Sequence, residues 1–238
     1  MNFKFLPNLI TLFNLFLGCI VTLLLIENNL EVKYVFTITV ICLILDYLDG
    51  YIARKLNVKS DIGIQLDSLA DLVSFGLVPG ILLYNMFNVA PSSSVGSISS
   101  SFIPFLGFII TLSSAYRLAR YNTRKYTSKF FKGLPTPANA VLIYSFAIIS
   151  AEGNSFSNII LDYNILMLIV IVSSILLVSN LKLLNFKFKS LKFKGNRRRF
   201  FIILISIPAL IIFGIYAIPL VLSVYILTSI LTFYKLKN

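Results

Sequence analysis

Long apolar stretches separated by short polar segments make up most of this chain. Their length matches the roughly 20 residues that an α-helix needs to cross a bilayer. Sustained alternation of apolar and polar residues, the pattern of strands, is absent from the sequence. The pattern predicts about eight membrane-spanning helices, over residues 9–26, 34–54, 65–87, 102–120, 136–151, 159–179, 200–216 and 218–234. The last two are close together and form either two spans or one re-entrant hairpin.

The composition places the chain among integral membrane proteins. Of its 238 residues, 58% are hydrophobic and 13% are charged. A soluble domain is about half apolar and about a quarter charged, and one soluble core of this size could not bury the surplus. We therefore expect an all-α fold, a polytopic membrane helix bundle. The two cysteines, Cys19 and Cys42, lie inside apolar stretches and indicate no disulfide framework.

The basic residues predict how the helices are oriented. The formal net charge is +12. The cations lie between apolar stretches rather than on a soluble face, which excludes nucleic acid as the partner and favours anionic lipid. They follow the second, fourth and sixth stretches and flank both ends of the chain, and Lys33 alone falls on the other side. By the positive-inside rule both termini are cytoplasmic, which requires an even number of spans.

Residues 181–199 form the most basic of these segments. Cations and aromatic residues alternate within it, as in Phe186-Lys187-Phe188-Lys189, which is typical of a segment lying on a membrane surface. The alternative is that its charges only determine topology.

Four carboxylates occupy positions where a membrane helix rarely carries charge. Asp46, Asp49, Asp67 and Asp71 lie in or at the cytoplasmic ends of the second and third stretches. An ionised carboxylate inside a bilayer costs about 2.5–3.5 kcal/mol, and neighbouring carboxylates also repel one another unless cations are present. The spacings i, i+3 and i, i+4 put each pair on one helix face. Because a short loop joins the two helices, we expect both pairs to converge on one pocket.

These acids favour a divalent metal site. The chain has no histidine, and a cluster of carboxylates without His or Cys suits hard cations such as Mg²⁺, Mn²⁺ or Ca²⁺. Two divalent ions would neutralise the cluster. The alternative is that the acids pair with Arg54, Arg117 and Arg120 and only hold helices together. Three cations do not match four acids at these spacings.

Together with small residues beside them, the acids spell a longer pattern. It runs Asp46-x-x-Asp49-Gly50-x-x-Ala53-Arg54, then eight residues, then Gly63-x-x-x-Asp67-x-x-x-Asp71. By this pattern the chain resembles the CDP-alcohol phosphotransferase family at all eight fixed positions of its signature. The resemblance covers the first six predicted spans and implies a division into a membrane core (1–180), a basic cytoplasmic loop (181–199) and a C-terminal helical hairpin (200–238).

The flanking segments narrow the resemblance to one branch. Residues 7–12 (PNLITL), 66–76 (LDSLADLVSFG), 116–122 (YRLARYN) and 132–140 (KGLPTPANA) look like those of the bacterial phosphatidylserine synthases. This implies transfer of the phosphatidyl group from CDP-diacylglycerol to L-serine, giving phosphatidylserine and CMP. The core signature alone leaves another acceptor open, either glycerol 3-phosphate or an inositol phosphate.

The resemblance also implies a homodimer in a bacterial inner membrane, with a two-metal site that faces the cytoplasm. By similarity, the ligands of two Mg²⁺ or Mn²⁺ ions are Asp46, Asp49, Asp67 and Asp71. The CDP site would be lined by Gly50, Ala53, Arg54, Gly63 and Asp67. Asp71 would also act as the base that takes the serine proton.

Three further residues are candidates for substrate contact. Our hypothesis is that Arg117, Arg120 or Asn122 binds the serine carboxylate or the lipid phosphate, because a cationic pair enters the pocket side of the fourth stretch. The alternative is that the arginines extend to lipid headgroups.

A divalent-cation transporter is the alternative from another class of protein, because intramembrane Asp clusters also mark ion paths. A transporter places its acids near the midplane and often has internal repeats. Here the acids lie toward one face and the sequence shows no repeat.

Overall fold

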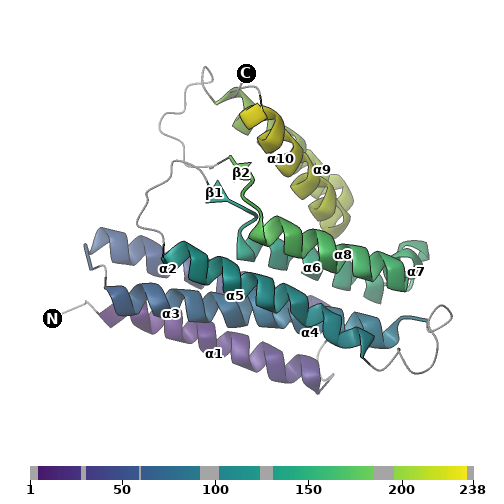
Figure 1. Cartoon of the computed structure of the whole chain (residues 1–238), viewed down its shortest axis with the longest axis horizontal. Coiled ribbons are helices and arrows are strands. Elements are labelled where there is room, and N and C mark those ends of the chain that lie inside the picture. Colours follow the sequence, from purple (N-terminus) through teal and green to yellow (C-terminus); the bar gives the residue numbers. More distant parts are fainter. Residues whose placement is uncertain are drawn as a thin grey trace.

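A computed structural model describes residues 5–27, 31–58, 60–91, 102–123, 131–184 and 196–234 (Figure 1). Helices form the framework of these residues. Strands β1 (Phe131–Lys132) and β2 (Lys182–Leu183) add one small antiparallel sheet. The predicted all-α class is therefore confirmed.

The helices lie where the apolar stretches predict them. They are α1 (Leu6–Ile26), α2 (Val32–Lys55), α3 (Asp61–Leu72), the π-helix η2 (Val73–Leu77), α4 (Val78–Val89), the 3₁₀-helix η3 (Ile103–Phe108), α5 (Ile109–Asn122), α6 (Thr136–Ala151), α7 (Ser155–Ile160), α8 (Tyr163–Val178), α9 (Arg197–Phe213), the 3₁₀-helix η4 (Gly214–Tyr216) and α10 (Ala217–Tyr234). The third predicted stretch corresponds to α3, η2 and α4 in succession, and the last two to α9 and α10. The short α7 was not predicted.

Several of these helices suit a membrane by length and composition. Leu6–Ile26, Val32–Lys55, Asp61–Val89 and Arg197–Thr232 are long and apolar enough to cross one, and α6 and α8 are shorter apolar helices. Many of their large side chains face outward, among them Phe16, Leu168 and Leu204. Such a surface is stable against lipid rather than water, and the protein is an integral membrane protein. The number of spans stays a prediction.

The helices α1 to α6 and α8 run lengthwise as one bundle, and α9 and α10 lie side by side and slope away from it (Figure 1). Gly214 joins α9 to η4 with a φ of +54°, a conformation that glycine adopts without a steric penalty. The bundle core contains large buried side chains such as Phe75, Phe87 and Tyr144.

Contacts at the two ends of the bundle agree with the prediction that successive loops lie on alternate sides of the membrane. The segments after α5 and α8, expected on the same side, pair as β1 and β2. At the other end, Tyr216 in the turn of the hairpin donates a hydrogen bond to Glu152, which follows α6. Which side faces the cytoplasm stays a prediction. Part of the basis for it lies outside the described residues, namely Lys4, Lys59, Arg124, Lys125, Lys129, Lys235, Lys237 and residues 185–195 of the basic segment.

The turn between α2 and α3 brings the two acidic helix ends together. Asn57 has a φ of +53° in this turn. Ser60 then caps α3, because its Oγ accepts a hydrogen bond of 3.0 Å from the backbone N–H of Gly63. Both helices pack against α1, and their acidic side chains approach one another beyond this turn.

Candidate active site and metal centre

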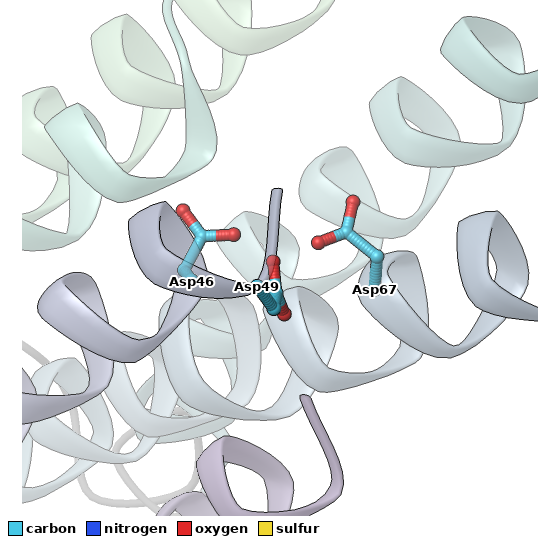
Figure 2. Close-up of side chains that lie close together, drawn as sticks. All are labelled: Asp46, Asp49 and Asp67. Atoms are coloured by element: carbon cyan, nitrogen blue, oxygen red, sulfur yellow. The ribbon is translucent and has the colours of Figure 1, made fainter. Parts of the chain in front are cut away.

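Three of the four predicted acids converge at this pair of helix ends. Asp46 and Asp49 come from α2 and Asp67 from α3, and their carboxylates lie close together (Figure 2). One carboxylate oxygen from each of the three lies within 4.8 Å of the others. The convergence inferred from the spacing is confirmed for these residues.

Asp71 extends this cluster by one turn of α3. The negative charges of Asp46 and Asp67 repel that of Asp71, and the positive guanidinium of Arg117 attracts it. Oδ1 of Asp71 is buried and has no hydrogen-bond partner. Among the described residues, none of the four acids forms an ion pair within 4.0 Å. The geometry therefore does not support the alternative that arginines pair with these acids to hold the helices together.

A cavity of about 470 Å³ opens beside the acids. It is lined by Pro7, Asn8, Thr11, Asp49, Gly50, Ala53, Arg54, Val58, Ser60, Gly63, Ile64, Asp67, Ser68, Asp71, Arg117, Leu118, Tyr121, Asn122 and Pro137. Every signature residue is in this lining except Asp46, which belongs to the acid cluster beside it. The structure thus brings together the residues that the pattern singles out.

The helix α1 contributes residues to which the sequence assigned no role. Thr11 donates a hydrogen bond of 2.5 Å to Oδ2 of Asp49. A Cβ atom at Gly63 would lie 3.0 Å from Oδ1 of Asn8, so the glycine leaves room for that amide at the cavity wall. The only signal in the sequence was the segment 7–12, which resembles the family but has no charged residue.

The three candidate substrate contacts have different surroundings. Arg117 lines the cavity, and its Nη1 donates a hydrogen bond of 2.7 Å to Oγ1 of Thr136 at the start of α6. Asn122 also lines the cavity, and its Nδ2 donates to Oγ of Ser68 at 2.9 Å.

Arg120 does not line this cavity. Its Nη1 donates to the carbonyl oxygen of Val178 at 2.8 Å, and its Nη2 donates to the side chain of Asn180. Both partners lie at the end of α8. The contact of Arg120 with substrate stays a prediction, and the contacts it makes in the structure tie α5 to α8.

Residues 4–175 match the CDP-alcohol phosphatidyltransferase family, and the chain belongs to that family. It is similar to proteins named CDP-diacylglycerol–serine O-phosphatidyltransferase. The Helicobacter pylori protein of that name is 30% identical over 232 residues, which cover 94% of this chain and 89% of the relative. The Methanocaldococcus jannaschii protein is 35% identical over 173 residues, covering 73% and 70%. The archaetidylserine synthase of Methanothermobacter thermautotrophicus is 34% identical over 149 residues, covering 61% and 58%.

Proposed function

We propose that this protein transfers the phosphatidyl group from CDP-diacylglycerol to L-serine, giving phosphatidylserine and CMP. The observation that carries the proposal is that one cavity is lined by every residue of the family signature except Asp46, which lies in the carboxylate cluster beside it. The names of the similar proteins support serine as the acceptor.

The acid cluster fits a hard divalent cation. All of its donors are carboxylate oxygens, three of them within 4.8 Å of one another, and a buried oxygen of Asp71 has no partner. We propose that two divalent ions, Mg²⁺ or Mn²⁺ with Ca²⁺ as a further candidate, are held by Asp46, Asp49, Asp67 and Asp71. Bound there, such ions polarise phosphoryl oxygens and neutralise charge on a phosphate leaving group.

We assign Arg54 to the diphosphate of the CDP group. It lies on α2 at the cavity wall, and a guanidinium offers parallel N–H donors that match phosphate oxygens. A Cβ atom at Gly50 would lie 3.2 Å from Nη1 of Arg54. Glycine at this position therefore leaves space around the guanidinium, and the small Ala53 and Gly63 leave further space for the nucleotide.

Asp71 is the base in this proposal, because the chain has no histidine and the free oxygen of Asp71 is at the cavity. It takes the proton from the serine hydroxyl as that oxygen attacks the phosphorus of the lipid-linked phosphate. The bond from this phosphorus to the CMP oxygen breaks, and CMP leaves with the electron pair.

The location suits both substrates. The diacylglycerol chains need lipid, and the outward-facing apolar side chains indicate that lipid surrounds the bundle. CDP and serine, by contrast, come from water. We propose a bacterial inner membrane, both termini in the cytoplasm, a cavity facing the cytoplasm and a homodimer. The division into a core (1–180), a basic loop (181–199) and a hairpin (200–238) is proposed with them.

The test is CMP release by the purified protein in mixed micelles with CDP-diacylglycerol and Mg²⁺ or Mn²⁺. Serine, glycerol 3-phosphate and inositol phosphate are offered separately. Asp71→Asn serves as the inactive variant, and Asp61→Asn as its matched control, because Asp61 is an exposed acid on the same helix outside the cavity.

We expect release with serine alone, lost in Asp71→Asn and on chelation, and retained in Asp61→Asn. Release with another acceptor would overturn the choice of serine. If folded protein releases no CMP with any acceptor, the assignment as an enzyme is overturned and the alternative of a cation transporter is favoured.

A further inference from the structure

The helix that carries Asp67 and Asp71 contains a π-helical turn directly after these acids. The elements α3, η2 and α4 form one continuous helix. In η2 the backbone N–H of Val78 donates to the carbonyl oxygen of Val73, five residues earlier instead of the four of an α-helix. Such turns are rare inside α-helices and occur frequently at functional sites. The place of η2 next to a proposed metal ligand therefore needs a structural reason.

The position of this π turn determines where Asp71 points. One residue of an α-helix corresponds to a rotation of about 100°. If the π turn moved by one turn toward the start of α3, the residues that it passed would rotate by about that angle relative to Asp67. Asp71 is among them, because it lies two residues before η2. The negative charges of Asp46 and Asp67 repel that of Asp71 and favour such a movement, so η2 must be held by other contacts.

Helix α1 holds η2 from one side. Oγ of Ser74 donates a hydrogen bond of 3.0 Å to Oδ1 of Asn14, and the carbonyl oxygen of Asn14 accepts from the same Oγ at 3.3 Å. Both residues are buried. A Cβ atom at Gly18, one turn further along α1, would lie 2.5 Å from Oγ of Ser74. Glycine at this position therefore lets α1 approach η2 closely enough for these contacts.

Helix α5 holds η2 from a second side. Oγ1 of Thr111 donates a hydrogen bond of 3.0 Å to the carbonyl oxygen of Gly76 in η2. A Cβ atom at Gly76 would lie 3.0 Å from Cβ of Ser114, so the backbone of η2 packs directly against α5. Movement of the π turn would break the contacts on both sides, because Ser74 and Gly76 would rotate away from α1 and α5.

We infer that Ser74 and Thr111 are positioning residues for Asp71, and that they act through η2. Their hydrogen bonds keep the π turn directly after Asp71, which keeps the carboxylate with the unpartnered Oδ1 at the cavity. Neither Ser74 nor Thr111 lines the cavity. The inference rests on the proposed metal centre and extends it to residues outside that centre.

The test is Mn²⁺ binding by the purified full chain without substrate, followed by the electron paramagnetic resonance signal of free Mn²⁺. Ser74→Ala and Thr111→Val each remove the hydroxyl on one side of η2, and the double variant removes both. We expect the Kd for Mn²⁺ to rise about 3- to 10-fold in each single variant and about 10-fold or more in the double variant. Thr111→Ser keeps the hydroxyl and should keep the Kd of the wild type.

Two comparisons separate positioning from a general loss of stability. Ser145→Ala also removes a buried hydroxyl, but this hydroxyl donates to the carbonyl oxygen of Leu142 within α6, and neither residue lines the cavity. Its Kd for Mn²⁺ should equal that of the wild type, whatever its thermal midpoint. In the Asp71→Asn background, Ser74→Ala and Thr111→Val should raise the Kd by less than about twofold, because the ligand that they position is already lost.

The failures of the two proposals can be told apart. If the wild type binds no Mn²⁺, the proposed metal centre fails and this inference fails with it. If the wild type binds Mn²⁺ and the variants keep its Kd, or raise the Kd equally in the Asp71→Asn background, only the inference is overturned. A wild type that binds Mn²⁺ but releases no CMP overturns the proposed enzyme, and the Kd values still decide the inference. Should Ser74→Ala not fold, Thr111→Val decides, because valine keeps the shape of threonine.

Discussion

The hydroxyl of Thr11 on α1 donates a hydrogen bond of 2.5 Å to Oδ2 of Asp49 on α2, and both side chains are buried. One oxygen of a proposed metal ligand is thereby held in place by a helix that carries no acid of the cluster. Partners of this kind orient a metal-binding carboxylate, and their loss commonly weakens metal affinity about 10- to 100-fold.

Thr11→Val removes the hydroxyl and keeps the shape of the side chain. We expect the Mg²⁺ or Mn²⁺ concentration for half-maximal activity to rise by about 10- to 100-fold. Thermal stabilisation by Mn²⁺, measured without substrate, should shift to higher metal concentration in parallel. Thr11→Ser keeps the hydroxyl and should stay close to the wild type. An unchanged metal dependence in Thr11→Val would contradict this role.

Gly107→Ala should destabilise the fold. A Cβ atom at Gly107 in η3 would lie 2.8 Å from the carbonyl oxygen of Gly80 and 2.9 Å from the backbone nitrogen of Tyr84. Both are backbone atoms of α4, so η3 and α4 must move apart. We expect the free energy of unfolding to fall by about 1–3 kcal/mol. The measurement is the thermal midpoint in detergent. Without the close approach, Ala in place of Gly in a helix stabilises by up to about 1 kcal/mol, so a raised midpoint would refute the prediction.

Arg117 and Arg120 should respond differently to the same substitution. Arg120→Gln removes the hydrogen bonds to the end of α8, so we expect a lower thermal midpoint with both substrate KM values within about twofold of the wild type. Arg117→Gln removes the cation at the cavity, and the KM for serine should rise by about 10-fold or more. A raised serine KM in Arg120→Gln at unchanged stability would restore Arg120 as a substrate contact.

Tyr216→Phe should loosen the hairpin and leave catalysis unchanged. The phenol oxygen of Tyr216 accepts a hydrogen bond of 2.5 Å from Asn154 and donates one to Glu152. No residue of α9, η4 or α10 is in the lining of the cavity. We expect faster amide hydrogen exchange across α9 and η4 at wild-type turnover. A loss of turnover without faster exchange would argue against treating the hairpin as separate from the core.

Much of the site could be predicted because it is local in the sequence. Asp46 and Asp49 share one face of α2, and Asp67 lies on the next helix after a short turn. Helical periodicity determines which side chains share a face, and a short connection makes consecutive helices neighbours. The positions of the helices followed in the same way from the lengths of the apolar stretches.

The contacts between distant helices could not be predicted this way. Thr11 and Asp49 are 38 positions apart, and Arg120 and Val178 are 58 apart. The sequence placed Arg120 among the substrate contacts because it shares a short basic segment with Arg117, whereas packing directs its guanidinium to α8.

By itself, the sequence determined that apolar helices cross a membrane and that acids on two consecutive helices meet, because both depend on helical repeat and span length. Only the tertiary structure decided which polar side chains of α1, α5 and α6 reach those acids and which are sealed away from them. The outcome depends on how each helix is rotated about its axis and packed against helices far away in the sequence. A helix that faces lipid is apolar on most sides, so its sequence pattern does not determine this rotation.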